Sequence, residues 1–340
     1  MTKTAKKWWS LTKQIPLYWV IIIALILALP VNIYINHFNV PVAHNNEGPE
    51  DCFLPYELLR QNDSKLTSQI MLVNVGIEDE KLMPLKEKVN QYLEEQKAGG
   101  TIKTASVYFK ILNDDHGWFV INPEEKYYLA SLLKVSFMIA MLKEAENNPG
   151  VLDKKVYYAK HSAALNPQAM LDHQLQPGRY YTIRELLKYA ISYSDNDAAY
   201  LVVDNFNLGT LQKLHSDLNL GGVDFHKEYF GTVEEYSRFL RILYNGSYIN
   251  NDMSEYALEL MTQSDFNDGI VKKIDKNVLV ARKFGERGLA DKELHEFGIV
   301  YLEGQPYLIG IMTRGKDYDE LKEIISEISL MVFKEMKKSV

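Results

Sequence analysis

Ser131 and Lys134, a serine and a lysine three residues apart, are the pair in this sequence best placed to do chemistry together. A turn-like segment precedes Ser131 and the apolar run 135–142 follows Lys134, so we expect Ser131 to lie at the start of a buried helix. Residues three apart share a helix face, which brings the lysine amine within reach of the serine oxygen. Burial and the positive end of the helix dipole favour the neutral amine, which is the form that accepts a proton. The pair therefore predicts a serine nucleophile activated by a lysine base.

A second polar motif, Ser194-Asp195-Asn196, separates two expected helices. Short hydrogen-bonding side chains between two apolar helices are expected to project into a cleft. In that position we expect Ser194 to relay a proton to the leaving group, and Asn196 to bind either a substrate amide or Lys134. Taken alone, this motif and Ser131 are each explained better by a helix N-cap.

A third motif, Lys283-Phe284-Gly285, lies on an expected strand that begins near Val278. Gly285 has no side chain, which lets a substrate backbone lie against the edge of that strand. Each of these motifs occurs by chance, but the three in this order are much harder to explain by accident. We therefore predict a single active site, with catalytic residues Ser131, Lys134, Ser194 and Lys283.

The composition is that of a globular protein with a substantial core, because 46% of the residues are apolar and 24% are charged. A net charge of −7, with no dense basic run beyond the N-terminal tail, argues against a nucleic-acid partner. Cys52 is the only cysteine, so an intramolecular disulfide is impossible. The eight histidines show neither H-x-x-x-H nor H-E-x-x-H spacing, and we expect neither a metal nor a cofactor.

The N-terminus contains an uncharged stretch from Ile15 to Ile35. At about 1.5 Å per residue, a helix of this length crosses the hydrocarbon core of a bilayer. Lysines precede the stretch and no Lys or Arg follows it until Arg60. This asymmetry predicts a cytoplasmic tail (1–14), a transmembrane anchor (15–36) and an extracytoplasmic remainder at the cell membrane. The alternative is a cleaved signal peptide, although no clear small-residue cleavage site follows the stretch.

The rest of the chain is expected to contain one large domain. Residues 37–80 read as a polar linker followed by a short helical lead-in, and residues 81–338 as the catalytic domain. Strand patterns lie near both ends of that domain, whereas the middle, about 131–265, is helical in pattern. This order predicts an α+β fold, in which one antiparallel sheet built from both ends carries an inserted all-α lobe. A cleft between the two parts is the natural place for a site.

Individual elements of that sheet and its covering helices are also predicted. Apolar periodicity predicts a helix from Pro84 that ends at Gly99, and a last amphipathic helix that contains Leu321 and Ile325. Strand-like runs on either side of the turns 113–117 and 303–306 predict two hairpins.

In its three motifs and their order, the sequence resembles the class A beta-lactamase family and the related penicillin-binding serine D,D-peptidases, over about Lys81 to Lys334. The resemblance implies a sheet flanked by terminal helices, an all-α lobe and an acyl-enzyme on Ser131. It also implies that Lys283 offers positive charge to a substrate carboxylate, and that backbone N–H groups of Ser131 and Glu286 form an oxyanion hole. The implied substrates are beta-lactams or peptides of the bacterial cell wall. The implied substrate contacts are Asn196, Gly285 and Glu286.

The sequence departs from that family at two places. The family's third motif usually has Thr or Ser, whose hydroxyl helps to bind the substrate carboxylate, where this chain has Phe284. Arg282 and Arg287 are the nearby candidates to replace that hydroxyl. The class A omega loop, whose glutamate activates the deacylating water, is mostly missing between residues 225 and 232, which leaves Glu228 as the nearby carboxylate. We therefore expect acylation of the serine but slow turnover of penicillin.

The sequence leaves two hypotheses open. The first is a membrane-anchored, extracytoplasmic serine hydrolase or acyl-transferase, with an acyl-enzyme on Ser131 and Lys134 as its base. The second is a catalytically weak or inactive module of the same fold that binds a cell-wall peptide or a partner protein. Phe284 and the short loop favour the second hypothesis. The retained motifs favour the first, because a binding module has little need for a buried lysine beside a serine.

Overall fold

The computed structural model describes residues 56–61, 69–114, 117–160, 173–224, 227–288 and 290–338, which belong to the unit Leu54–Val340. Within these ranges, no helix has the length and apolar character that a membrane crossing needs. The predicted tail and anchor, as well as Cys52, lie outside the described residues. Membrane attachment therefore stays a prediction.

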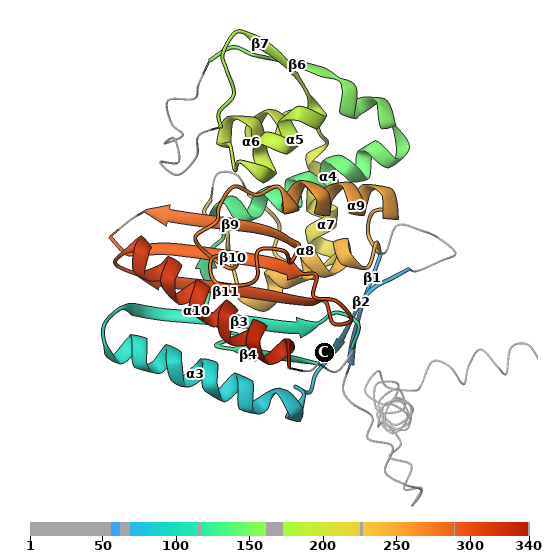
Figure 1. Cartoon of the computed structure of the whole chain (residues 1–340). Coiled ribbons are helices and arrows are strands. Elements are labelled where there is room, and N and C mark those ends of the chain that lie inside the picture. The colour runs from blue at the N-terminus through green and yellow to red at the C-terminus, as the bar shows by residue number, and fades with distance from the viewer. Residues whose placement is uncertain are drawn as a thin grey trace, which may run out of the picture. The chain divides into compact units, whose positions relative to one another are not determined.

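The central element is a five-stranded sheet with the order β4-β3-β11-β10-β9, in which all neighbours are antiparallel (Figure 1). Strands β3 (Ile102–Ile111) and β4 (Trp118–Ile121) form the first predicted hairpin. The other three strands come from the far end of the chain: β9 (Val280–Gly288), β10 (Lys292–Val300) and β11 (Tyr307–Gly315). Strand β11 pairs with β3, which joins the two ends of the domain as predicted. Strand β9 lies at one edge of the sheet.

Two helices cover one face of this sheet, α3 (Met83–Ala98) and α10 (Tyr318–Met336), and both lie in front of it in Figure 1. Side chains alternate between the two faces of a strand. Accordingly, Val107 and Phe109 pack with the core under these helices, whereas Tyr108 joins the core on the opposite face. Both terminal helices were predicted, and both are confirmed.

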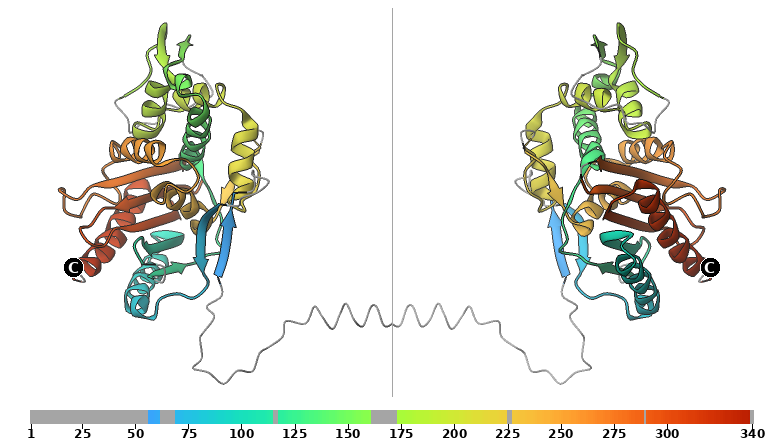
Figure 2. Two further views of the ribbon diagram at one scale, coloured as in Figure 1. Left: turned by 90° about the vertical axis from the view of Figure 1, so that its right-hand side faces the viewer. Right: turned by 90° about the vertical axis from the view of Figure 1, so that its left-hand side faces the viewer.

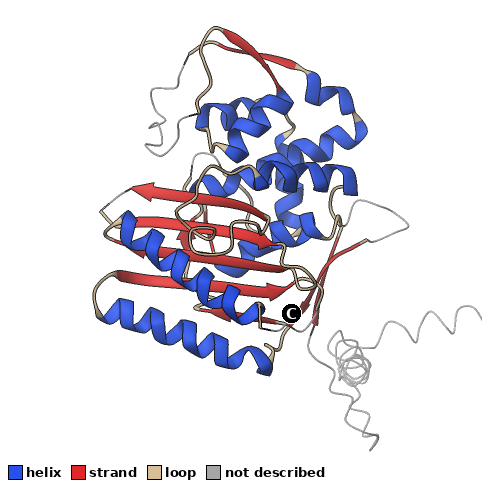
Figure 3. Ribbon diagram, viewed as in Figure 1, coloured by secondary structure: helices blue, strands red, loops and turns tan. Residues whose placement is uncertain are grey.

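The opposite face of the sheet contacts α8 (Val233–Tyr244), and a helical lobe follows beyond it (Figures 1 and 3). A capping box of Thr182 and Glu185 begins one lobe helix, and a box of Thr232 and Glu235 begins α8. The helices of the lobe are α4 (Leu133–Asn147), α5 (Ile183–Ser192), α6 (Asn196–Val203), α7 (Leu208–Asp217) and α9 (Asn251–Thr262). The inserted all-α lobe is therefore confirmed.

Short elements connect these parts, and one strand pair, β6 with β7, lies at the tip of the helical lobe (Figure 2). The short strand pairs are β5 (Tyr127–Tyr128) with β8 (Phe230–Gly231), and β6 (Lys155–Tyr158) with β7 (Arg179–Thr182). The 3-10 helices are η1 (Glu80–Leu82), η2 (Ala130–Leu132) and η3 (Pro149–Asp153).

The helical lead-in predicted within residues 37–80 is wrong for the part that the structure describes. Strands β1 (Tyr56–Arg60) and β2 (Ile70–Val75) form an antiparallel pair instead. The cause is tertiary packing. Leu72 is buried in the core that the helical lobe shares, and Arg241 of α8 donates hydrogen bonds of 2.6 and 2.7 Å to two groups of β2.

Candidate active site

Ser131 lies where η2 leads into α4, so the prediction that it begins a buried helix is confirmed. It is 7% exposed, and the neighbouring Leu132 is fully buried. The preceding residue, Ala130, has a φ of +50°, a left-handed conformation that is uncommon for alanine. Strained backbone of this kind persists where the surrounding structure holds it, and it clusters at functional sites.

The Lys134 amine is buried one turn further along the same helix. Its Nζ donates hydrogen bonds to the Ser194 carbonyl oxygen, to Ser194 Oγ at 3.2 Å and to Asn196 Oδ1 at 2.6 Å. Burial lowers the pKa of Lys134 to about 7, although the charges of Asp195 and Glu286 raise it in part. Near neutral pH a large fraction of this amine is therefore uncharged, as a general base requires.

The loop between α5 and α6 places Ser194 beside both lysines of the predicted site. Ser194 is fully buried and has a φ of +56°. Its Oγ lies 3.2 Å from Lys134 Nζ and 2.8 Å from Lys283 Nζ, so two amines converge on one hydroxyl. The N-cap interpretation also holds for this motif, because Asp195 accepts a hydrogen bond of 2.8 Å from the Ala198 N–H at the start of α6. Because the side chain of Asp195 caps α6, the side chain of Ser194 is available to the candidate site.

Lys283 comes from the edge strand β9 and is fully buried. Besides the bond to Ser194 Oγ, its Nζ donates to the Phe284 carbonyl oxygen at 3.0 Å. Burial, and then the nearby Lys134 amine, lower the pKa of Lys283 well below its usual range, against the opposing charges of three carboxylates. The three motifs that the sequence analysis combined are thus in contact through Ser194 Oγ.

Gly285 allows β9 to pack directly against the segment that carries Ser131. A Cβ at Gly285 would lie 2.8 Å from the Leu129 carbonyl oxygen and 3.1 Å from the Leu132 backbone nitrogen. Cβ atoms of native proteins essentially never show the first of these contacts, and the second is tighter than nine in ten of theirs. The absence of a side chain at Gly285 therefore allows β9 to lie close to the segment that carries Ser131. It also brings the backbone of the next residue, Glu286, close to the segment that carries Ser131.

A comparison with protein families decides the classification of this chain. The model described as the beta-lactamase enzyme family matches residues 84–336. The chain belongs to this family. The match begins within α3 and ends at the last residue of α10, so it spans the whole sheet and the helical lobe.

Solved structures of the beta-lactamase fold are similar to this chain. PBP-A, in an acyl-enzyme complex with penicillin G, is 19% identical with a TM-score of 0.65, over 76% of this chain and 97% of that one. The TLA-1 extended-spectrum beta-lactamase is 18% identical with a TM-score of 0.65, over 75% and 98% of the two chains. A class A beta-lactamase from Bacteroides cellulosilyticus is 18% identical with a TM-score of 0.63, over 75% and 99%. At these identities the likeness shows the fold. Among curated proteins, none matches this chain.

In this member of the beta-lactamase family, the side chain at the middle position of the third motif, Phe284, belongs to the core under α3 and α10. Its side chain is 1% exposed and stacks on Phe266, with ring centroids 4.4 Å apart and an interplanar angle of 22°. The same ring lies 4.5 Å from Lys283 Nζ, which is a cation–π distance. No local sequence pattern indicated that Phe266 would stack on Phe284. Phe266 lies outside β9, in the segment that follows α9.

Glu296, a residue that sequence reasoning missed, forms a buried ion pair with Arg282, which it named. Glu296 lies on β10 opposite Phe284 and is fully buried, with its Oε1 3.6 Å from the Nε of Arg282. Burial raises the pKa of Glu296 to about 7, against the opposing charge of Arg282, and its Oε2 accepts a 2.6 Å hydrogen bond from the Ile270 N–H. The sequence signal that could have pointed to Glu296 was its position within the largely apolar segment 294–300.

Glu228, the carboxylate considered for the deacylating role, forms an ion pair with Arg287, and its side chain is 54% exposed. Arg287 in turn lies over the Tyr128 ring, 4.4 Å from its centroid. These contacts tie Glu228 to the outer end of β9 at the surface. They supply no reason to assign it the activation of a water beside Ser131.

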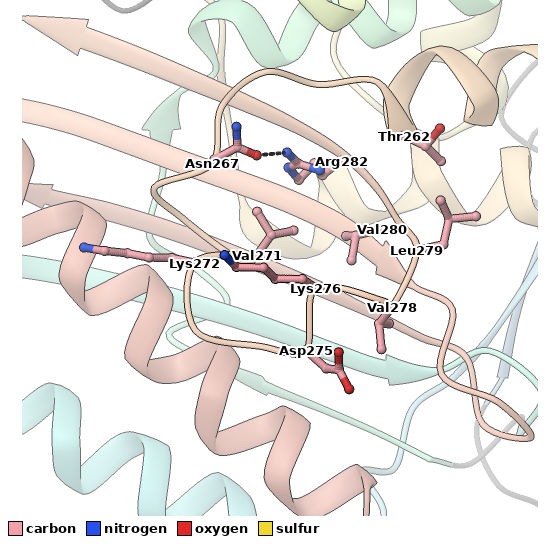
Figure 4. A pocket seen from close by; sticks show the side chains of 10 residues that line it. All are labelled: Thr262, Asn267, Val271, Lys272, Asp275, Lys276, Val278, Leu279, Val280 and Arg282. Carbon is pink, nitrogen blue, oxygen red and sulfur yellow. Dashed lines mark hydrogen bonds between the residues drawn. The ribbon is translucent and has the colours of Figure 1, made fainter.

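A cavity of about 600 Å³ opens beside the start of β9 (Figure 4). Its lining residues are Thr262, Asn267, Val271, Lys272, Asp275, Lys276, Val278, Leu279, Val280 and Arg282. Figure 4 shows Arg282 bonded to Asn267 at one end of this space. The lining does not include Ser131, Lys134 or Ser194, so we do not connect this cavity with the acylation chemistry.

Proposed function

We propose that this chain is a serine hydrolase or acyl-transferase of the beta-lactamase family that forms an acyl-enzyme on Ser131. The observation that supports it best is the Lys134 amine, which is buried near a serine at a strained helix start and has a pKa of about 7. Desolvating an amine costs free energy, and a purely structural role does not explain why it is placed against the Ser194 hydroxyl, one helical turn from Ser131.

In the proposed acylation, Ser131 Oγ attacks a substrate carbonyl carbon while its proton passes to Lys134 Nζ. The new C–O bond forms as the carbonyl electron pair moves onto its oxygen, which the backbone N–H groups of Ser131 and Glu286 stabilise. The bond to the leaving group then breaks. The leaving group takes the proton through Ser194 Oγ, which is within hydrogen-bond distance of Lys134 Nζ.

We further propose that the acyl-enzyme is long-lived in water. Its hydrolysis needs a positioned water and a base, and the carboxylate near the shortened loop, Glu228, is held by Arg287. Acyl transfer to another acceptor, or slow hydrolysis of an ester or peptide, fits this site better than rapid turnover of a beta-lactam. Beta-lactams and peptides of cell-wall type are the proposed donors, and the chain is proposed to face the outside of the cell membrane from an anchor at residues 15–36.

The rate of acylation is expected to depend on pH through Lys134. Because burial lowers its pKa to about 7, the neutral base is scarce in mild acid and predominant in mild alkali. The rate of labelling of Ser131 by a fluorophosphonate should therefore rise through about pH 7 and then level off, after subtraction of reagent hydrolysis at each pH. A rise that begins only near 10.5, the ordinary lysine pKa, would contradict the role of Lys134.

The experiment that tests the function is incubation of the full chain, in detergent, with a fluorophosphonate and with a labelled penicillin, followed by mass spectrometry of the peptide that contains Ser131. We expect an adduct on Ser131 with the fluorophosphonate and none in the Ser131→Ala variant. If neither reagent labels Ser131 in the folded chain, the non-catalytic binding module becomes the better account. A penicillin adduct that is released quickly would contradict the proposed slow deacylation.

A further inference from the structure

The side chains of Lys283, Gly285 and Arg287 belong to one face of β9, because successive side chains of a strand alternate between its faces. Contacts show that this is the face of the candidate site. Lys283 Nζ bonds to Ser194 Oγ at 2.8 Å, and a Cβ at Gly285 would meet the segment that carries Ser131. Arg287 lies on the same face, two residues beyond Gly285, which is about 7 Å along the strand.

The other two cations of β9 are buried and bonded inside the protein. Lys283 has no exposed surface, and its amine donates to two oxygen atoms of the protein. Arg282 lies on the opposite face of the strand, is 5% exposed, and is paired with Glu296 at 3.6 Å. Arg287 is therefore the cation of β9 that a bound molecule reaches most easily, since 21% of its side chain is exposed.

Two contacts orient the Arg287 guanidinium. Its Cζ lies 4.4 Å from the centroid of the Tyr128 ring, and its Nη2 donates to Oε1 of Glu228. Tyr128 comes three residues before Ser131, so the stacked guanidinium is held beside the segment of the nucleophile. A planar guanidinium held in this way suits a carboxylate, which accepts two parallel hydrogen bonds from it.

Glu228 occupies the place that the carboxylate of a bound molecule would take. It precedes β8, and 54% of its side chain is exposed. An ion pair exposed to this degree contributes little to stability, because water screens the charges and both long side chains lose freedom. A carboxylate from outside the protein can therefore replace Glu228 on Arg287 at little cost.

The proposed acylation determines which end of a donor reaches Arg287. Ser194 passes the proton to the leaving group, so the leaving group lies on the side of Ser131 where Ser194 and Lys283 meet. Along β9, Arg287 lies on the other side of Gly285. It therefore faces the acyl part of the donor.

Resting on the proposed acyl-enzyme function, we propose that Arg287, stacked on Tyr128, binds a carboxylate on the acyl part of the donor, and that Glu228 gives up its pair with Arg287 when such a donor binds. The preferred donors carry this carboxylate about 7 Å from the scissile carbonyl carbon, on the side away from the leaving group. Arg287 thus adds to the site a contact that the three motifs do not contain.

The test compares two N-acylglycyl thioesters of methyl thioglycolate, with the full chain in detergent. One carries a succinyl group, whose free carboxylate reaches the required distance, and the other carries the methyl ester of that group. The bond from Ser131 Oγ to the carbonyl carbon forms as the C–S bond breaks, and the thiol leaves with the serine proton. Thiol release and the mass of the Ser131 peptide are measured, and fluorophosphonate labelling runs in parallel.

After correction for reaction without protein, we expect the acid to acylate Ser131 about threefold faster than the ester, as for a partly exposed ion pair. Arg287→Gln should lower this acid-to-ester ratio to about one. Glu228→Gln should raise it to about tenfold, because no carboxylate then competes for the guanidinium. In the double variant the ratio should equal that of Arg287→Gln, because Glu228 acts through Arg287. A damaged fold would slow both thioesters alike, so the ratio reports the contact itself.

A matched control lies in the helical lobe. Arg184 of α5 lies over the Tyr256 ring, 5.2 Å from its centroid, and pairs with Asp153 at 3.8 Å. Arg184→Gln removes a stacked and paired arginine of the same kind. It should leave the rates of both thioesters unchanged.

The outcomes separate this inference from the function on which it rests. If the fluorophosphonate labels Ser131 but acid and ester react alike in the native and Glu228→Gln chains, the inference is wrong and the acyl-enzyme function stands. A preference for the acid that survives in Arg287→Gln would place the anion elsewhere and also overturn it. So would an equal effect of Glu228→Gln with and without Arg287. If no reagent labels Ser131, the function fails and the inference fails with it.

Discussion

Replacing Lys134 with methionine is expected to slow acylation of Ser131 by about 10²- to 10⁴-fold, the usual contribution of a general base. Methionine keeps a long apolar side chain in the buried space and cannot accept the serine proton. The variant also leaves Asn196 Oδ1 and the Ser194 carbonyl without the lysine donor, so thermal unfolding must be measured beside the rate. The rise of the labelling rate through about pH 7 should also disappear in this variant.

A matched control lies on the same helix. Lys143 of α4 donates to the Tyr248 carbonyl oxygen at 2.7 Å, away from the three motifs. Lys143→Met removes one amine from α4 in the same way and should leave the labelling rate unchanged. If the Lys134→Met chain is folded and is labelled within threefold of the native rate, Lys134 is not the base and another group must take the serine proton.

Adding one methyl group at Gly285 is expected to reduce acylation by about 10²-fold, the order of effect of a misplacement near 1 Å in an active site. The new Cβ would lie 2.8 Å from the Leu129 carbonyl oxygen, 3.1 Å from the Leu132 nitrogen and 3.0 Å from its Cγ. Two of these atoms are backbone and cannot rotate away, so β9 must move from the Ser131 segment. Overpacking of this kind also destabilises a fold by about 1 to 3 kcal/mol.

Gly221→Ala is the control for that variant, because a Cβ at Gly221 meets no atom within 4 Å. Its labelling rate and melting temperature should match those of the native chain. If Gly285→Ala keeps the native rate, the close contact between β9 and η2 does not position the reacting groups, and the assignment of Glu286 to the oxyanion hole loses its geometric basis.

Local patterns in the sequence predict most of the helices and strands. The capping boxes at Thr182 and Thr232 and the apolar periodicity around Leu321 are written within a few residues, so the start and the buried face of a helix follow from them. The two sheet hairpins follow in the same way from strand runs on either side of short turns. The lead-in failed because β1 and β2 are stabilised by Arg241, whose position depends on packing far along the chain.

The sequence by itself determined the identity and order of the groups in the candidate site, and the helix start that carries Ser131 and Lys134. Only the tertiary structure decided how burial and neighbouring charges shift the pKa values of these groups. Whether Lys283, Arg282 and Arg287 are available to a substrate depends on Ser194, Glu296 and Glu228, of which Ser194 and Glu228 lie far from their partners in sequence and Glu296 lies on the next strand. Helix and strand patterns arise from interactions over a few residues, whereas desolvation and ion pairing depend on which distant segments pack around a side chain.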